Sequence, residues 1–511
     1  MMRSITLPSG ADWLETPRGI LIALAATLFA GLAIARLGML PILAFWALPV
    51  VAAVVLIIFR NPQLGLYATM IMGFLSVGMR RYVPAPTGLA VDGFLAITLL
   101  VVIFRKFHTK DWDSIKIPVN GLLLLWFFYN VAELANPEMR SAAAWFYAVR
   151  GVALYMIIAV PLAILLFNSR KDLDRILLCM FSLSLLGTLW GLKQLYIGLD
   201  AGENAWLSVP GNQSTHVLFG KLRVFSYYSD AGQFGASQAA MGVIATVIAL
   251  GPGKPSRRIG FAAVGLISFY GMLISGTRGA IVIPATGFMA YFVITRNFKI
   301  VAVGVLSLLT TYSVLKYTSI GHGNYHIQRL RTALDSDNPS FQVRLENQKK
   351  LRRYLETRPF GGGVGSGGYW GMRFSPNTFL ANLALDSWYV KIAAEQGPVG
   401  LFYYILMLLY ILGAGALRII RIVDPILRQK MMALFASMVG VAFASYGNQV
   451  FGQMPTGIII YLSIAFIFIS HRLDNENEKG VDNAGGVKQG YTPMAAEVVT
   501  QGRDMIKGKG C

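Results

Sequence analysis

Residues 151–167 read GVALYMIIAVPLAILLF and contain no charged side chain in 17 consecutive positions. A run of about 17 to 25 apolar residues, folded as a helix, crosses the ~30 Å hydrocarbon core of a bilayer. Comparable runs follow one another along most of the 511 residues, and most are separated by short segments. The pattern predicts an all-α polytopic membrane protein.

The composition excludes an ordinary soluble enzyme, because 55% of the residues are hydrophobic and 14% are charged, whereas soluble domains carry about 25% charged residues. The formal charge of +20 gathers in the segments between the apolar runs, so it indicates orientation in the membrane and no nucleic-acid partner. Cys179 lies in an apolar run and Cys511 is the last residue. Two such cysteines make neither a disulfide framework nor a metal site, and we expect no metal and no cofactor.

Hydropathy predicts fourteen membrane helices, give or take two, with about 12–14 as the working number. The expected spans are 20–35, 37–59, 63–79, 88–104, 119–134, 142–167, 174–196, 232–250, 259–275, 278–295, 299–316, 397–417, 431–446 and 455–470.

Lys and Arg are concentrated in every second junction, while the short alternate junctions are poor in them, with Arg80 and Arg81 as the clearest exceptions. Positive residues stay on the cytoplasmic side, so both termini are expected there. The predicted organisation is a cytoplasmic N-terminus (1–19), membrane helices 1–11 (20–316), an extracytoplasmic helical loop domain (317–396), membrane helices 12–14 (397–471) and a disordered cytoplasmic tail (472–511).

The loop domain is basic, although it is expected on the side that the charge rule leaves poor in Lys and Arg, and anion binding is the simplest reason. Residues 338–359, NPSFQVRLENQKKLRRYLETRP, predict a helix that Asn338 caps and Pro359 ends. At ~100° per residue, Arg344 and Arg352 fall on its apolar stripe. A guanidinium there is either paired with a carboxylate or positioned to grip a phosphate.

Three further stretches carry polar candidates. In Ser275–Gly279, Thr277 or Ser275 is expected to cap a helix whose N-terminus, with Arg278, favours an anion; snorkelling of Arg278 to lipid head groups is the alternative. The run GGGVGSGG at residues 361–368 is expected to be a hinge or tight turn and not a dinucleotide site, since no strand precedes it. Asp386 is either a counter-ion of nearby cations or a general base.

Four segments, taken in order, resemble the O-antigen ligases and O-antigen polymerases of bacterial envelopes. They are LRVFSYYSDAGQFGASQA from Leu222, LISGTRGA from Leu273, VRLENQKKLRRYLETRPFGGGVGSG from Val343 and LDSWYVKIAAEQGPVGL from Leu385. They span about residues 222–401, and the first 200 residues add only hydropathy to the resemblance.

The resemblance implies an architecture like that of GT-C glycosyltransferases and a metal-independent transfer of a glycan from undecaprenyl diphosphate. It implies that Arg278 and Arg344 hold the diphosphate, with Arg223 as a weaker candidate. Arg352 is a further diphosphate candidate because of its place on the apolar stripe of the predicted helix. The family has a histidine where this chain has Asp386, so either Asp386 is the base, or the register differs by a turn, or the base lies elsewhere.

The implied partners are the lipid-linked donor, an acceptor that is lipid A core, a protein or another glycan, and the lipids of the bacterial inner membrane, with the active site periplasmic. Ligase and polymerase are not separated by these residues. A polysaccharide transporter or lipid-linked oligosaccharide flippase is the alternative. That class places functional charges at mid-membrane, where the sequence shows few.

Overall fold

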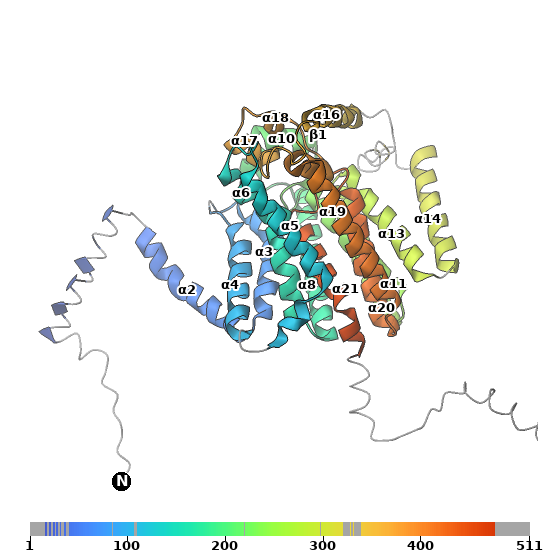
Figure 1. Ribbon diagram of the computed structural model, residues 1–511. Helices are drawn as coiled ribbons and strands as arrows, with labels where there is room; N and C mark the ends of the chain where they lie inside the picture. The colour runs from blue at the N-terminus through green and yellow to red at the C-terminus, as the bar shows by residue number, and fades with distance from the viewer. Residues whose placement is uncertain are drawn as a thin grey trace, which may run out of the picture.

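The computed structural model describes residues 40–83, 85–106, 110–218, 220–296, 298–319 and 339–475, with isolated residues between 16 and 36 and residues 328 and 331. Within these ranges, helices pack side by side into a bundle, with α2 and α14 at its two edges (Figure 1). The expected span 20–35 is described only at isolated residues, and most of the N-terminal segment 1–19 and the tail from residue 476 onward lie outside the described residues.

The first part of the bundle is made of seven α-helices with short 3₁₀ and π turns between them. They are α2 (Leu40–Arg60), α3 (Gln63–Met79), α4 (Leu89–Lys106), α5 (Pro118–Ala132), α6 (Ala142–Val149), α7 (Tyr155–Leu166) and α8 (Arg170–Leu192), with 3₁₀ turns at Lys110–Ile115 and Glu133–Ala135 and π turns at Arg150–Leu154 and Lys193–Ile197.

The second part contains α11 (Ala231–Leu250), α12 (Pro255–Ile274), the 3₁₀ turn η5 (Arg278–Ile281), α13 (Val282–Thr295), α14 (Phe298–Tyr317), α19 (Trp388–Ile420), α20 (Pro425–Ala444) and α21 (Thr456–Phe468). Proline at the first helical position begins α5, α12 and α20, where its missing N–H costs nothing. Ser169 and Asp172 form a capping box at the start of α8.

Among the described residues, eight helical segments are long and apolar enough to cross a membrane: Pro118–Ala135, Ala142–Leu166, Arg170–Ile197, Ala231–Leu250, Pro255–Ile274, Arg278–Thr295, Trp388–Ile420 and Pro425–Ala444. Three shorter apolar helices accompany them, at Leu48–Arg60, Gln63–Met79 and Thr456–Phe468. The chain is therefore a multi-pass helical membrane protein. Each expected span from 37–59 onward coincides with a helix, and the full number of spans stays a prediction.

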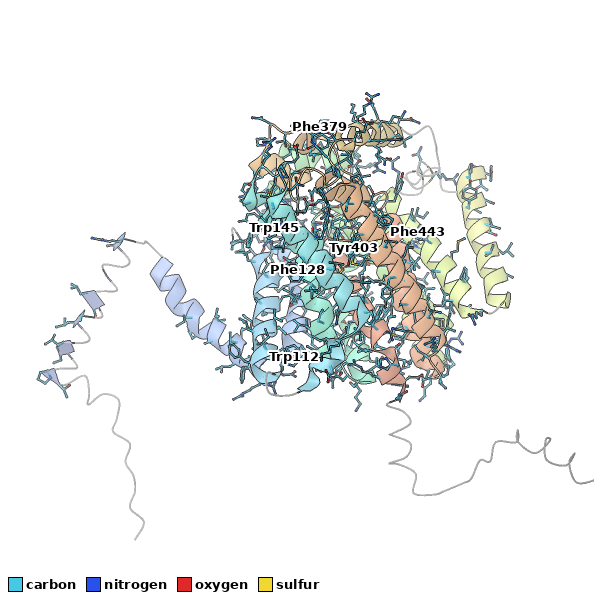
Figure 2. The ribbon with its side chains drawn as sticks, in the orientation of Figure 1. Trp112, Phe128, Trp145, Phe379, Tyr403 and Phe443 are labelled. Atoms are coloured by element: carbon cyan, nitrogen blue, oxygen red, sulfur yellow. The ribbon has the colours of Figure 1, made fainter. Side chains whose placement is uncertain are left out.

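The bundle is apolar on its outside and partly polar within. Phe128 and Phe443, labelled in Figure 2, are 56% and 58% exposed on the flank of the bundle. The fully buried Gln238 of α11 accepts hydrogen bonds from the hydroxyls of Ser184 (2.9 Å) and Thr188 (3.1 Å) on α8. In water, the favoured arrangement has polar side chains outside and apolar side chains inside. A hydrocarbon surrounding favours the arrangement found here, with apolar side chains outside.

Short elements cover one end of the bundle, called here the α16 end (Figure 1). They are α9 (Ala201–Leu207), α10 (Pro210–His216), α16 (Pro339–Leu355), α17 (Gly368–Phe374), α18 (Phe379–Asn382) and a hairpin of β1 (Val217–Leu218) and β2 (Lys221–Leu222). Phe379 marks this end and Trp112 the opposite end (Figure 2). The hairpin is the one departure from the all-α prediction among the described residues.

The glycine-rich segment forms tight turns that are packed against the start of α19. Gly361, Gly363, Gly365 and Gly368 all have positive φ, between 60° and 86°. The N–H of Gly362 donates to the carbonyl of Ala394 (2.9 Å). Gly397, with φ 70°, breaks α19 at the point of contact, and a Cβ there would collide with the carbonyl oxygen of Pro359. The tight-turn interpretation of this segment is confirmed.

We expect Gly397→Ala to destabilise the protein, because φ near 70° alone costs a residue with a side chain about 1–3 kcal/mol and the Pro359 carbonyl leaves no room for a methyl group. Gly413→Ala is the matched control, since Gly413 lies in the same helix with nothing within 4 Å of a built Cβ. Thermal unfolding in detergent should show a lower midpoint for Gly397→Ala and an unchanged midpoint for Gly413→Ala. Equal midpoints would contradict the packing described above.

Candidate anion-binding site

Arg344 of α16 and Asp386, which lies just before α19, form an ion pair. Nε of Arg344 is 3.2 Å from Oδ2 of Asp386, and the two side chains are 38% and 52% exposed. An ion pair so accessible to solvent contributes only ~0–1 kcal/mol to stability. Its importance is therefore geometric, because it joins two sequence-predicted residues that are 42 positions apart.

A cleft that is open to solvent lies beside this pair. Its lining includes Arg344, Asn347, Gln348, Asp386, Tyr446 and Gly447. The ion pair is made by Nε of Arg344. The terminal Nη1 lies beside Gly447, 4.0 Å from the position that a Cβ would take there. The two interpretations of Arg344 are thus compatible: the side chain is paired with a carboxylate, and it also borders an open cleft.

The loop between α20 and α21, residues 445–455, connects this pair to the segment around Arg278. The carbonyl of Ser445 accepts from the N–H of Trp388 (2.9 Å), and the amide of Gln449 donates to the carbonyl of Leu385. On its other side, Asn448 is packed so closely on Gly279 that a Cβ on that glycine would collide with its amide. Gly447 borders Arg344 and the next residue borders Gly279, so the two segments meet at one short loop.

Arg223 joins these residues through the buried Thr277, which precedes the half-buried Arg278. Nη2 of Arg223 donates to the hydroxyl of Thr277 (3.0 Å), and Nη1 donates to the carbonyl of Thr215 (3.0 Å). The Thr277 hydroxyl donates in turn to the carbonyl of Ala231 at the start of α11 (2.8 Å). Arg223 therefore lies next to the Arg278 segment, and its guanidinium is engaged by protein groups.

The structure corrects the capping prediction for Ser275–Gly279. Thr277 precedes η5 without a side-chain capping hydrogen bond, because its hydroxyl is directed to Ala231. The hydroxyl of Ser275 donates to the carbonyl of Met272 (2.6 Å) and accepts from the N–H of Thr277 (3.2 Å). Arg278 begins a 3₁₀ turn and not an α-helix.

The prediction that Arg352 shares the packed face of α16 is wrong. Arg352 is exposed, whereas the preceding Leu351 is 4% exposed. Eight residues at ~100° each place Arg352 about 80° around the helix from Arg344, which turns it away from the cleft. Arg352 does not line that cleft.

Sequence reasoning missed His216, which ends α10 and is 3% exposed. Its Nε2 accepts from the N–H of Ala231 (3.3 Å), so in the neutral ring Nδ1 carries the proton and donates to the carbonyl of Asn212 (2.9 Å). Burial lowers the pKa of His216. Both ring nitrogens bind backbone groups, so this histidine holds α10 on α11. It does not take the place of the family histidine that the resemblance puts at Asp386.

Arg81, an exception to the charge pattern, has a structural explanation. Its guanidinium lies against the rings of Trp206 and Phe225, with its carbon 4.4 and 4.5 Å from their centroids. It donates to the carbonyls of Ser226 (2.5 Å) and Tyr228. Burial lowers the pKa of Arg81 to about 10. Arg81 thus fastens the 197–231 segment to the end of α3. The sequence indicated a structural role for Arg81 because it lies in a junction that the positive-inside rule leaves poor in Lys and Arg.

Among the described residues, no group of three or more His, Cys, Asp or Glu side chains is arranged to hold a metal ion. The expectation of a metal-independent site remains a prediction. Comparison with known proteins adds no assignment: no family model matches the chain, and no curated protein matches it. The functional interpretation rests on the four sequence segments and on the geometry of the cleft.

We expect Arg81→Ala to lower the stability of the protein by ~2–3 kcal/mol, because two carbonyls lose a charged donor inside a packed loop. Arg80→Ala is the matched control, since Arg80 is the exposed neighbour. Limited proteolysis of the 197–231 segment, together with thermal unfolding, measures the effect. If both variants resist protease as the unaltered protein does, Arg81 does not fasten this segment.

Proposed function

We propose that the protein is a glycosyltransferase that moves a glycan from undecaprenyl diphosphate to an acceptor hydroxyl, as an O-antigen ligase or as a polymerase of surface polysaccharide repeats. The observation that carries the proposal is the Arg344–Asp386 pair at an open cleft. The segment of Arg278 meets the same loop from its other side. A cation and a carboxylate beside one opening provide a binder for the leaving group and an acceptor for a proton.

In the proposed reaction, the acceptor oxygen attacks the anomeric carbon and the bond from that carbon to the diphosphate oxygen breaks. The electron pair of that bond goes to the diphosphate, which gains negative charge as it leaves. Guanidinium groups already in place stabilise this charge without reorganisation, and the Nη groups of Arg344 suit phosphate oxygens. Asp386 takes the proton of the acceptor hydroxyl and, through its second oxygen, orients Arg344.

The proposal includes an orientation. The α16 end is periplasmic, both termini are cytoplasmic, and the protein lies in a bacterial inner membrane with 12–14 spans and a GT-C-like arrangement. Supporting this, the basic residues Arg60 and Arg105 lie in the last turns of α2 and α4, and Arg296 directly follows α13, all at the ends away from α16 (Figure 1), as the positive-inside rule requires.

The transporter alternative receives less support from the partly buried charges. Arg150 is paired with Asp92 at 2.8 Å, and Lys193 with Glu203 at 2.6 Å. Charges that face a transport path are expected to border a wet cavity, whereas these four side chains form ion pairs with one another. Purified protein in proteoliposomes separates the classes, because a transferase forms product with both substrates on one side.

We expect Arg278→Ala and Arg344→Ala each to reduce glycan transfer on the order of 100-fold, since loss of one stabilising donor costs ~3 kcal/mol in the transition state. Arg353→Ala is the matched control, because Arg353 is exposed on the same helix. Surface glycan in a deletion strain complemented with each variant, at equal protein level, is the measurement. Normal glycan with either of the first two variants would overturn the assignment.

Asp386→Asn is expected to slow transfer while donor binding is retained, because the amide cannot take a proton but keeps the shape of the side chain. Stability should stay unchanged, since the exposed pair contributes at most ~1 kcal/mol. Single-turnover transfer and donor affinity of the purified variant measure the two steps separately. Equal loss of both would instead make Asp386 a structural partner of Arg344.

A further inference from the structure

A second cleft that is open to solvent lies at the α16 end of the molecule. Its lining includes Arg140, Tyr354, Arg358, Ser366, Asn377 and Phe379. Tyr354 follows Arg344 by ten residues on α16, and ten residues of helix are ~15 Å long. The two clefts are therefore placed at the two ends of one helix, with Leu380 lining the second and Ala384 the first.

Two aromatic rings form a platform in the second cleft. Tyr354 and Phe379 are stacked with ring centroids 5.0 Å apart and planes at 21°. Phe379 is 44% exposed and lies at the tip of the α16 end (Figure 2). The carbon of the Arg358 guanidinium lies 4.5 Å from the Tyr354 centroid. Phe379 is the exposed ring of the pair, and Tyr354 is half-buried beneath it. A stacked pair at an open cleft offers an apolar face on which the C–H face of a sugar ring packs.

Polar groups surround the platform, and one of them lacks a partner. The Ser366 hydroxyl oxygen is buried and has no hydrogen-bond partner among the described residues. The Ser366 and Tyr354 hydroxyls flank Gly362. They lie 3.1 and 3.2 Å from the position that a Cβ of residue 362 would take. An unsatisfied buried hydroxyl is unfavourable, and a hydroxyl-rich ligand in the cleft would offer it a partner. Asn377 and Thr378 add further polar groups to the lining.

The charge of the cleft favours an acidic ligand. Arg358 is paired with Glu138, with 3.1 Å between Nε and Oε1. Arg140 also lines the cleft and is exposed. Two arginines against one glutamate leave one positive charge in excess, and a guanidinium at an open cleft suits a carboxylate or phosphate substituent.

From the platform, the hydroxyls and the charge, we propose that this second cleft binds a carbohydrate acceptor that carries acidic groups. The carbohydrate lies on Tyr354 and Phe379 and extends along α16, so that its reactive hydroxyl reaches Asp386. The acceptor role rests on the proposed function, whereas carbohydrate binding does not. Among the acceptors that the resemblance allows, this choice excludes a protein.

The test is photo-crosslinking in the full-length protein, with p-benzoylphenylalanine in place of Asn377, in cells that make surface glycan. The same protein in nanodiscs with purified rough lipopolysaccharide as the probe gives a defined second measurement. We expect a carbohydrate adduct that falls at least tenfold with Tyr354→Ala and persists with Tyr354→Phe, which keeps the ring. Phe379→Ala is the second variant, should Tyr354→Ala not fold. Unchanged thermal unfolding shows that a variant is folded.

Three results would overturn the proposal: no carbohydrate adduct in folded protein, an adduct that both ring deletions leave unchanged, or a polypeptide adduct in its place. Arg344→Ala separates this inference from the proposed function, because it should abolish transfer and leave the adduct intact. If transfer survives Arg344→Ala while the adduct forms, the transferase mechanism fails and the carbohydrate site stands.

Discussion

Backbone N–H and C=O groups outside a helix need other hydrogen-bond partners. At the α16 end, the loop 445–455 supplies such partners to the segments around the candidate site. It accepts from the backbone at the start of α19, donates through Gln449 and is held to α11 by Gln233, which bonds to Gln453 (3.1 Å) and accepts from Thr456 (2.7 Å). A segment with no apolar period thus fixes the distances between residues from three helices, and the geometry of the site depends on its pairing.

The membrane helices could be predicted because hydropathy is a local property and the bilayer imposes a minimum length. The helix from Pro339 was also predictable, since its proline start and Pro359 are local signals. The breaks were not predictable: the positive φ of Gly397 follows from the approach of Pro359, which is 38 residues away in the sequence. The hairpin at Val217–Leu222 is too short to produce an alternating pattern.

The candidate residues were found one at a time, and their arrangement was not. Motif spacing drew attention to Arg344 and Asp386, but their pairing depends on how α16 lies against α19. Arg352 was misplaced because a helical stripe is broad: Arg344 and Arg352 both fall within it, although they lie about 80° apart around the helix. Thr277 was misread since a hydroxyl that can cap a helix can equally well bond to a neighbouring helix, and here Ala231 competes successfully.

Arg81 has a consequence for biogenesis. In the proposed orientation, the ribosome delivers this arginine to the insertion machinery well before Trp206 and Phe225, the rings that it finally contacts, have been synthesised. Its transfer across the bilayer must therefore occur without the partners that later shield its charge. The α3–α4 hairpin is expected to remain loosely seated until α8 and the segment after it have emerged, so assembly of this protein is delayed by more than a hundred residues of translation.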